Sequence, residues 1–209
     1  MLIMAKAPEA GAVKTRLEPL LGPDGCAALQ AALIRHTVSW AVGAADLVSL
    51  AYAPASAGLV LADLVPPGVA LFPQRGPDLG ARLRSACADV AGRRGGPLAV
   101  IGTDAPLLGP NHLQAAFAAL AGGVDACVIP AHDGGYVMIA LAAPTPEAFK
   151  LPAVAWGGPH VFELTLDALA RAGLRTSVLS RLPDLDDPAD AVALREHPDC
   201  PPALIEALA

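Results

Sequence analysis

A basic loop near the amino terminus is the first segment of this sequence that suggests chemistry. It follows a short apolar run at residues 2–5 and carries Lys6, Lys14 and Arg16 with a single acid, Glu9. An ammonium meets phosphate oxygens as a point charge and a guanidinium meets them as a planar fork, while Gly11 permits close backbone approach. The Walker A spacing is absent. The alternatives are a phosphate-binding loop and an ordinary solvated basic loop.

The second segment is Gly102-Thr103-Asp104, which ends another apolar run. Ligands of open α/β sheets bind at the carboxyl ends of the strands, so Asp104 is expected to face the same crevice as the basic loop. One or two carboxylates beside phosphates suit Mg²⁺. The alternative is that Asp104 only caps a helix or turn.

The third segment is the acidic stretch at residues 184–190. Asp187 precedes Pro188, a pattern that predicts an N-cap for the following helix. Asp186 is not needed for that cap. Asp186 is therefore a candidate for the second ligand of a divalent metal, Mg²⁺ or Mn²⁺, beside Asp104.

Two further loops are candidates for substrate contacts. The loop from Gln74 to Gly80 is rich in glycine and is expected to touch a base or ribose, although Asp78 as an N-cap explains part of its pattern. The second loop is a tight turn containing an acid and an aromatic residue, which suits an acceptor but also an ordinary hairpin. It consists of Asp133, Gly134, Gly135 and Tyr136.

The elements that must position these loops alternate between apolar runs and helix-period segments, as in a mostly parallel α/β sheet. Strands are expected at residues 2–5, 46–53, 69–72, 97–102 and 125–130, and helices at 24–42, 78–91, 111–121 and 159–172. In the common strand order 3-2-1-4 the first and fourth strands are neighbours. After residue 130 we expect an antiparallel ribbon or edge strand at 136–141, an irregular flap at 144–159 and a strand at 175–179. The sequence reads as a single domain, residues 1–209.

The composition excludes several classes of protein. Hydrophobic residues make up 54% and charged residues 16% of the 209 residues, which argues against disorder. The net charge of −6 argues against a nucleic-acid partner, and no apolar run is long enough for a membrane span. Single cysteines without C-x-x-C spacing indicate neither zinc nor disulfides. We therefore expect a soluble cytoplasmic protein; the oligomeric state stays open.

Taken in order, these motifs resemble a known family. They read A-K-x-P-x-x-G-x-V-K-T-R-L from Ala5, G-T-D-x-P-x-L from Gly102, D-G-G-Y from Asp133 and D-x-D-x-P-x-D from Asp184. The chain is similar to the A-type glycosyltransferase-like proteins often labelled arsenosugar biosynthesis glycosyltransferases. That family belongs with the molybdopterin-guanylyltransferase-like and 2-phospholactate-guanylyltransferase-like nucleotidyltransferases. The similarity covers almost the whole chain.

The resemblance implies a nucleotide-diphospho-sugar transferase fold (GT-A, Rossmann-like), a three-layer sandwich. It implies that Lys14 and Arg16 face nucleotide phosphates, with Asp104 as a catalytic metal ligand together with Asp186. Residues expected to contact the nucleotide are Ala5, Lys6, Gly11, Lys14, Arg16, Gln74 and Gly80. Residues expected to contact the acceptor are Asp133, Gly134, Gly135, Tyr136 and Trp156.

The chain departs from the family pattern at two places. Where the family typically has P-W-S-T-P, this chain reads Ala155-Trp156-Gly157-Gly158-Pro159, which removes two hydroxyls near the expected acceptor. Where the family typically has Thr, this chain has Asp187.

Three functions remain open from the sequence. The leading interpretation is nucleotidyl transfer, in which an oxygen of a small phosphorylated acceptor attacks the α-phosphorus of a nucleoside triphosphate (NTP) and pyrophosphate leaves. The second is glycosyl transfer from a nucleotide sugar. The third, kept open by the missing hydroxyls, is nucleotide binding without turnover.

Overall fold

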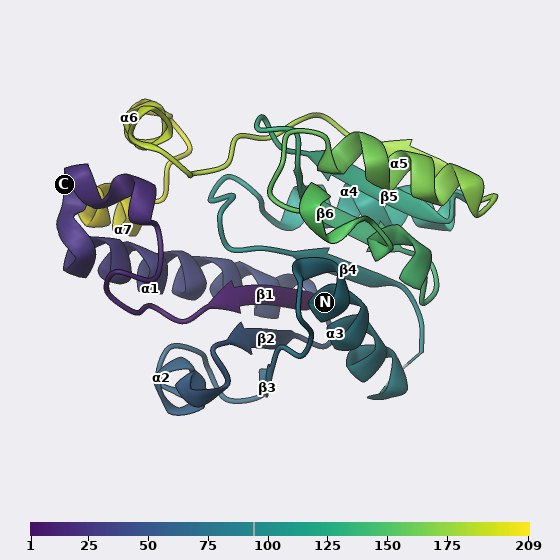
Figure 1. The fold of residues 1–209 in the computed structure, drawn as a ribbon, viewed down its shortest axis with the longest axis horizontal. Helices are drawn as coiled ribbons and strands as arrows, with labels where there is room; N and C mark the ends of the chain where they lie inside the picture. Colours follow the sequence, from purple (N-terminus) through teal and green to yellow (C-terminus); the bar gives the residue numbers. More distant parts are fainter. Residues whose placement is uncertain (94) are drawn as a thin grey trace.

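The computed structural model describes residues 1–93 and 95–209, which form a twisted seven-stranded sheet with helices on both faces (Figure 1). The strand order is β3-β2-β1-β4-β6-β5-β7. β6 runs antiparallel to β4 and β5, and the other neighbours are parallel. The strands are β1 (Leu2–Lys6), β2 (Ser49–Ala53), β3 (Ala70–Pro73), β4 (Leu98–Ile101), β5 (Ala126–Pro130), β6 (Tyr136–Leu141) and β7 (Thr176–Val178). The predicted order of the first four strands is confirmed. The strand at 136–141 is antiparallel as predicted, but it lies inside the sheet between β4 and β5 and is not an edge strand.

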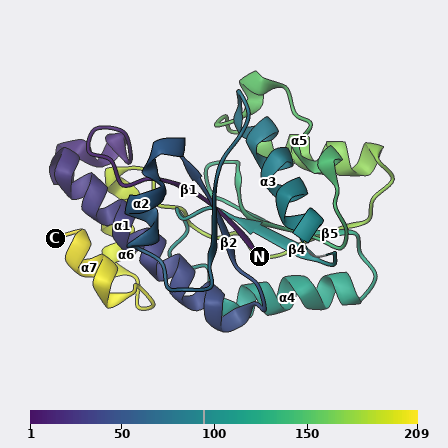
Figure 2. The same ribbon diagram turned by 90° about the horizontal axis from the view of Figure 1, so that it is seen from below.

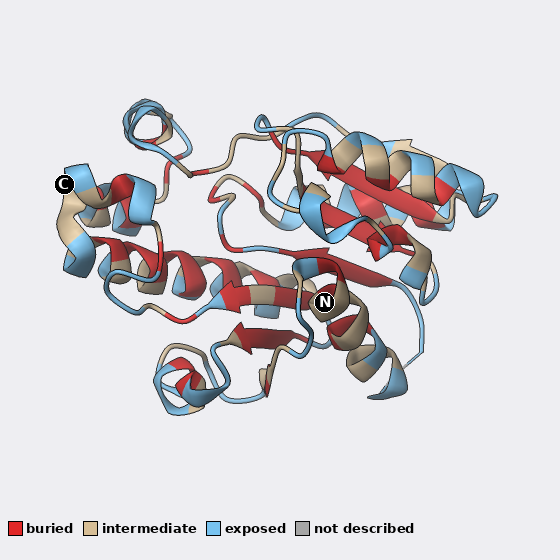
Figure 3. Cartoon of the chain, in the orientation of Figure 1, coloured by how far each residue is buried: buried red, intermediate tan, exposed pale blue. Residues whose placement is uncertain are grey.

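Helices cover the sheet on two sides, with α1 and α4 on one face and α3 and α5 on the other (Figure 2). The longer helices are α1 (Glu18–Ala44), α3 (Leu79–Arg93), α4 (Pro110–Ala121) and α5 (Val161–Arg171). Neighbouring residues of β1 enter opposite cores: Leu2 packs with α3 and α5, and Ile3 packs with α1 and α4. Both sides of the central strands are therefore buried (Figure 3), which explains why these runs lack alternation. The predicted three-layer α/β fold is confirmed.

Several elements differ from the prediction. α1 begins at Glu18 instead of residue 24, because a turn at Gly22 (φ 67°) joins two helical pieces across Pro23. The short helices α2 (Gly58–Ala62) and α7 (Pro202–Ala207) were not predicted. α7 and α6 (Pro188–Glu196) pack their apolar side chains against α1 in a third cluster. Helices of one or two turns owe their stability to such packing, so their own sequences give weak signals.

A crevice opens where β1 and β4 diverge. β1 pairs with β2 along its whole length, from Leu2 to Lys6, but it pairs with β4 only at Leu2 and Ile3. Beyond that point the buried side chain of Gln30, from α1, donates to the Lys6 carbonyl at 3.1 Å and to the Thr103 hydroxyl at 3.3 Å. The crevice thus lies at the topological switch point, where open α/β sheets bind ligands.

Within residues 1–93 and 95–209, no helix combines the length and the apolar character required to cross a membrane.

Asp187 caps α6, as predicted. Its carboxylate accepts from the backbone amides of Ala189 and Asp190, at 2.8 and 3.0 Å. We expect Asp187→Ala to lower the free energy of unfolding by about 0.5–2 kcal/mol, because two amides at the helix start lose their acceptor. Urea denaturation measures this. Asp187→Thr, which restores the residue type that the resembled family carries, is the control and should recover most of the loss. Equal stability of Asp187→Ala and the wild type would contradict the capping role.

Candidate active site

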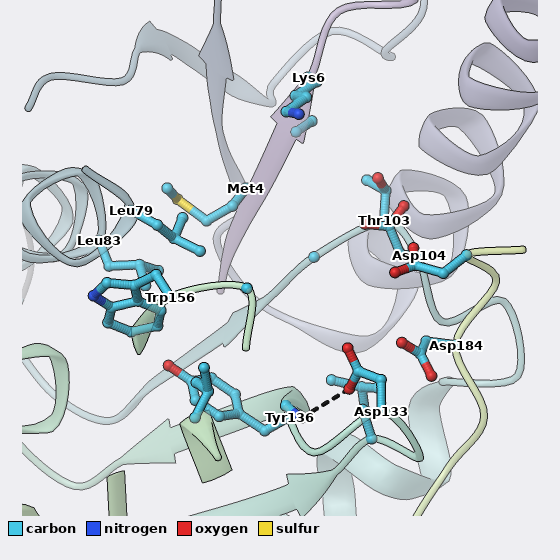
Figure 4. A pocket seen from close by; sticks show the side chains of 18 of the residues that line it. Met4, Lys6, Leu79, Leu83, Thr103, Asp104, Asp133, Tyr136, Trp156 and Asp184 are labelled. Atoms are coloured by element: carbon cyan, nitrogen blue, oxygen red, sulfur yellow. Dashed lines mark hydrogen bonds between the residues drawn. The ribbon is translucent and has the colours of Figure 1, made fainter. Parts of the chain in front are cut away.

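A cleft of about 840 Å³ occupies the switch point (Figure 4). Its walls come from the loop after β1, the loop after β4, the start of α3, the turn before β6 and the extended segment before α6. The predicted site residues that line it are Ala5, Lys6, Lys14, Arg16, Gln74, Asp104, Asp133, Gly135, Tyr136, Trp156 and Asp186. Gly11, Gly80 and Gly134 lie outside this lining. The fold therefore brings segments from the whole length of the chain to one cleft.

Lys14 lies against the two acids that the sequence nominated as metal ligands. Its ammonium forms an ion pair with Asp104, donates to the Leu185 carbonyl at 2.6 Å and lies 3.7 Å from Asp186 Oδ1. Only 6% of the Lys14 side chain is exposed, although its backbone adopts the left-handed conformation (φ 51°, ψ 33°). A non-glycine residue held in this conformation is frequently functional.

The acids form a larger group than the predicted pair. Carboxylate oxygens of Asp133, Asp184 and Asp186 lie within 4.8 Å of one another. The prediction did not include Asp184, yet the sequence contained a signal: in an extended segment, side chains two residues apart point to the same side. Asp184 and Asp186 are such a pair, and the D-x-D spacing would have found both.

Two carboxyl groups of this cluster are harder to ionise than usual. Burial and the neighbouring Asp133 raise the pKa of Asp184 to about 6, and burial also raises the pKa of Asp186. Lys14 and Arg16 oppose the shift of the Asp186 pKa. Burial is the largest cause of both shifts, because a carboxylate removed from water is harder to ionise.

The other residues predicted to contact the nucleotide differ in their solvent exposure and in the hydrogen bonds that they already make. Arg16 is 74% exposed, and its guanidinium lies 3.6 Å from Asp186. Lys6 is exposed at the end of β1. Gln74 lines the cleft, but its amide group already donates to the carbonyls of Ala5 and Ala51, at 3.2 and 2.9 Å. Gln74 therefore ties β1 and β2 together and has only its carbonyl oxygen left for a ligand.

Close backbone contact explains the first glycine of the D-G-G-Y turn. A Cβ placed on Gly134 would lie 1.9 Å from the Pro159 carbonyl oxygen, and the Gly134 carbonyl accepts from the Phe162 amide at 2.9 Å. The Gly135 amide donates to Asp133 Oδ1 at 2.7 Å (Figure 4). The turn is thus locked to the start of α5, which fixes Asp133 on the cleft wall.

Tyr136 and Trp156 form an apolar wall at the other end of the cleft (Figure 4). The Tyr136 hydroxyl and the Trp156 Nε1 are both buried, and neither has a hydrogen-bond partner among the residues that the structure describes. Burial raises the pKa of Tyr136 far above its ordinary value. The indole rests on α3, because a Cβ on Gly80 would lie 2.6 Å from Trp156 Nε1. Gly80, which the sequence predicted to contact the nucleotide, is buried, and the Trp156 indole packs against it.

Tryptophan fluorescence can test this packing of Trp156 against Gly80. In Gly80→Ala the added methyl group would also meet the Phe149 carbonyl oxygen at 2.7 Å, so we expect Trp156 to leave this position and its emission to shift to the red. Gly92→Ala in the same helix is the matched control, since nothing lies within 4 Å of its Cβ. Both variants should be made on a Trp40→Phe background, which leaves Trp156 as the only indole. Identical spectra for the two variants would contradict the proposed packing.

A family profile described as "Uncharacterized protein conserved in bacteria (DUF2064)" matches residues 37–158 of the chain. No curated protein matches the chain. Among solved structures, a protein from Desulfovibrio desulfuricans G20 assigned to the nucleotide-diphospho-sugar transferases is 27% identical, with a TM-score of 0.86. That alignment covers 95% of this chain and 87% of the other.

Two more distant structures share the fold. One is CMP:2-keto-3-deoxy-manno-octonic acid synthetase complexed with CTP, at 13% identity and TM-score 0.58, covering 94% of this chain and 98% of the other. The other is molybdopterin-guanine dinucleotide biosynthesis protein A from Archaeoglobus fulgidus, at 14% identity and TM-score 0.53, covering 91% and 94%. The chain therefore belongs to the family of uncharacterized proteins conserved in bacteria (DUF2064) and, as the sequence predicted, to the nucleotide-diphospho-sugar transferase superfamily of enzymes.

Proposed function

We propose that the protein is a metal-dependent nucleotidyltransferase that uses an NTP and a small phosphorylated acceptor. The observation that carries the proposal is the contact of Lys14 with Asp104 and Asp186 at the switch-point cleft, next to the exposed Arg16. This arrangement gathers carboxylates for a divalent ion and bases for phosphates in one place. The similarity to a synthetase whose structure holds CTP supports a nucleotide as the ligand.

The donor atoms of the site fit a hard divalent cation. The candidate ligands are carboxylate oxygens, which Mg²⁺ and Mn²⁺ prefer. Asp133 and Asp184 place further carboxylate oxygens within 4.8 Å of Asp186, one member of the predicted pair. We propose that Asp104 and Asp186 hold the ion, with Asp133 and Asp184 adding negative charge around it. When bound, the ion would neutralise phosphate charge.

The reaction that suits this site needs little covalent chemistry from the protein. An acceptor phosphate oxygen would form the new bond to the α-phosphorus while the bond to the bridging oxygen of pyrophosphate breaks. Lys14 and Arg16 would bind the departing phosphates, and the apolar wall of Tyr136 and Trp156 would exclude water beside the acceptor. Such catalysis consists mainly of positioning and charge stabilisation. An ionised phosphate oxygen needs no general base.

Glycosyl transfer is the second candidate function. The structure from Desulfovibrio desulfuricans G20, assigned to the nucleotide-diphospho-sugar transferases, favours it. A nucleotide sugar offers two phosphates, whose charge the metal could largely neutralise, whereas an NTP adds a third that needs bases beyond the metal. The presence of both Lys14 and Arg16 therefore favours the NTP.

One prediction from the proposed function concerns the metal ligands. Asp104→Asn and Asp186→Asn should each abolish Mg²⁺-dependent nucleotide binding, because each removes one direct ligand, while Asp133→Asn and Asp184→Asn should only weaken it. Isothermal titration with Mg²⁺ and NTP measures this, and thermal unfolding controls for folding. If Asp133→Asn and Asp184→Asn abolished binding but Asp104→Asn did not, the ion would belong to the Asp133, Asp184 and Asp186 group instead.

Another prediction distinguishes nucleotidyl transfer from glycosyl transfer. The wild type should bind an NTP more tightly than the matching nucleotide sugar, and Lys14→Ala or Arg16→Ala should remove that preference. Each charge-assisted hydrogen bond contributes about 1.5–3 kcal/mol, so a loss of about tenfold or more in NTP affinity is expected per substitution. Tighter binding of the nucleotide sugar, with NTP affinity unchanged in both variants, would favour glycosyl transfer.

A further inference from the structure

Lys14 occupies the position that the proposed metal needs. Its ammonium makes an ion pair with Asp104, donates to the Leu185 carbonyl at 2.6 Å and lies 3.7 Å from Asp186. A divalent cation bound by both carboxylates would lie beside this ammonium, and two cations cannot share the same carboxylate oxygens without strong repulsion. Binding the metal therefore requires Lys14 to move.

The flexible side chain of Lys14 can make this movement while its backbone stays in place. Val13 and Leu17 beside it are buried, and the Lys14 carbonyl accepts from the Leu17 amide at 2.8 Å, whereas the lysine stem has four rotatable carbons. Lys14 also sits in the left-handed conformation (φ 51°), which disfavours side chains with a Cβ.

The two acidic segments are also joined by a backbone hydrogen bond that does not involve Lys14. The Leu185 amide donates to the Asp104 carbonyl at 2.8 Å, which joins the two acidic segments directly. The Asp186 amide donates to Asp190 Oδ2 at 2.9 Å. The side chains of Asp104 and Asp186 are 53% and 40% exposed, so a cation from solvent can reach both.

We infer that Lys14 is a displaceable internal counter-ion, which holds Asp104 and Asp186 in the ligand-free protein and is exchanged for the divalent cation. The released ammonium lies on the cleft wall and becomes available to nucleotide phosphates. Lys14 thereby links metal binding to nucleotide binding, as a positioning residue in one state and a phosphate ligand in the other. This inference rests on the metal dependence proposed above.

Titration with Mn²⁺ alone tests the exchange. Lys14→Met keeps most of the side-chain volume but removes the competing charge, so it should bind Mn²⁺ at least about tenfold more tightly than the wild type. Lys14→Arg, which keeps the charge, should not gain affinity. Arg16→Met is the matched control: it removes a charge 3.6 Å from the same Asp186, but from a side chain that is 74% exposed. Its gain should stay below about threefold, because exposed charges are screened by solvent.

A second measurement uses the wild type and does not depend on any variant folding. Lys14 should be protected from reductive methylation without metal and should become reactive when Mn²⁺ saturates the site, as read by mass spectrometry. The exposed amines of Lys6 and Lys150 are internal controls and should react equally in both states.

The outcomes are distinguishable. Tighter Mn²⁺ binding by Lys14→Met together with metal-induced labelling of Lys14 supports the exchange. Equal Mn²⁺ affinity of the wild type and Lys14→Met, with Lys14 still protected, overturns the exchange but leaves metal dependence standing. Absence of Mn²⁺ binding by the wild type and every variant overturns both the exchange and the metal dependence of the proposed function.

Discussion

The site depends on how a buried ammonium is neutralised. Lys14 has a side chain that is 94% removed from solvent, and a charge in that position is tolerated only with carboxylate and carbonyl partners. Those partners come from the loop after β4 and from the segment before α6, both far from Lys14 in the sequence. The contacts of the Lys14 ammonium therefore link the start, the middle and the end of the chain at the opening of the β1–β4 crevice.

The crevice itself follows from the sheet. β1 and β4 separate after two paired residues, and beyond that point Gln30 donates to the Lys6 carbonyl. Gln74 in turn donates to carbonyls of the β1–β2 pair, so amide side chains supply donors to the backbone around the crevice. The loops that follow β1 and β4 extend past the paired residues and carry charged side chains into the cleft.

The two ends of the cleft have different chemistry. One end gathers Asp104, Asp133, Asp184 and Asp186 around Lys14, while the other consists of the rings of Tyr136 and Trp156. Glycines hold both ends in place, since Gly134 lets the turn meet Pro159 and Gly80 lets the indole rest on α3. A ligand with a charged phosphate part and a less polar part would match this division, which agrees with a nucleotide meeting a small acceptor.

The sequence by itself determined the α/β class, the first four strands in order, the antiparallel strand 136–141 and the cap at Asp187. Most of these features depend on local periodicity, turn residues and capping, which a linear pattern records, while the strand order follows the common order of such sheets. The sequence also selected Lys14, Asp104 and Asp186 as chemically important, and its D-x-D spacing contained the signal for Asp184. Only the tertiary structure decided that the lysine contacts both acids and that Trp156 packs against Gly80. Those relations join residues distant along the chain, and they arise from burial and charge neutralisation in the folded protein, which no local pattern encodes.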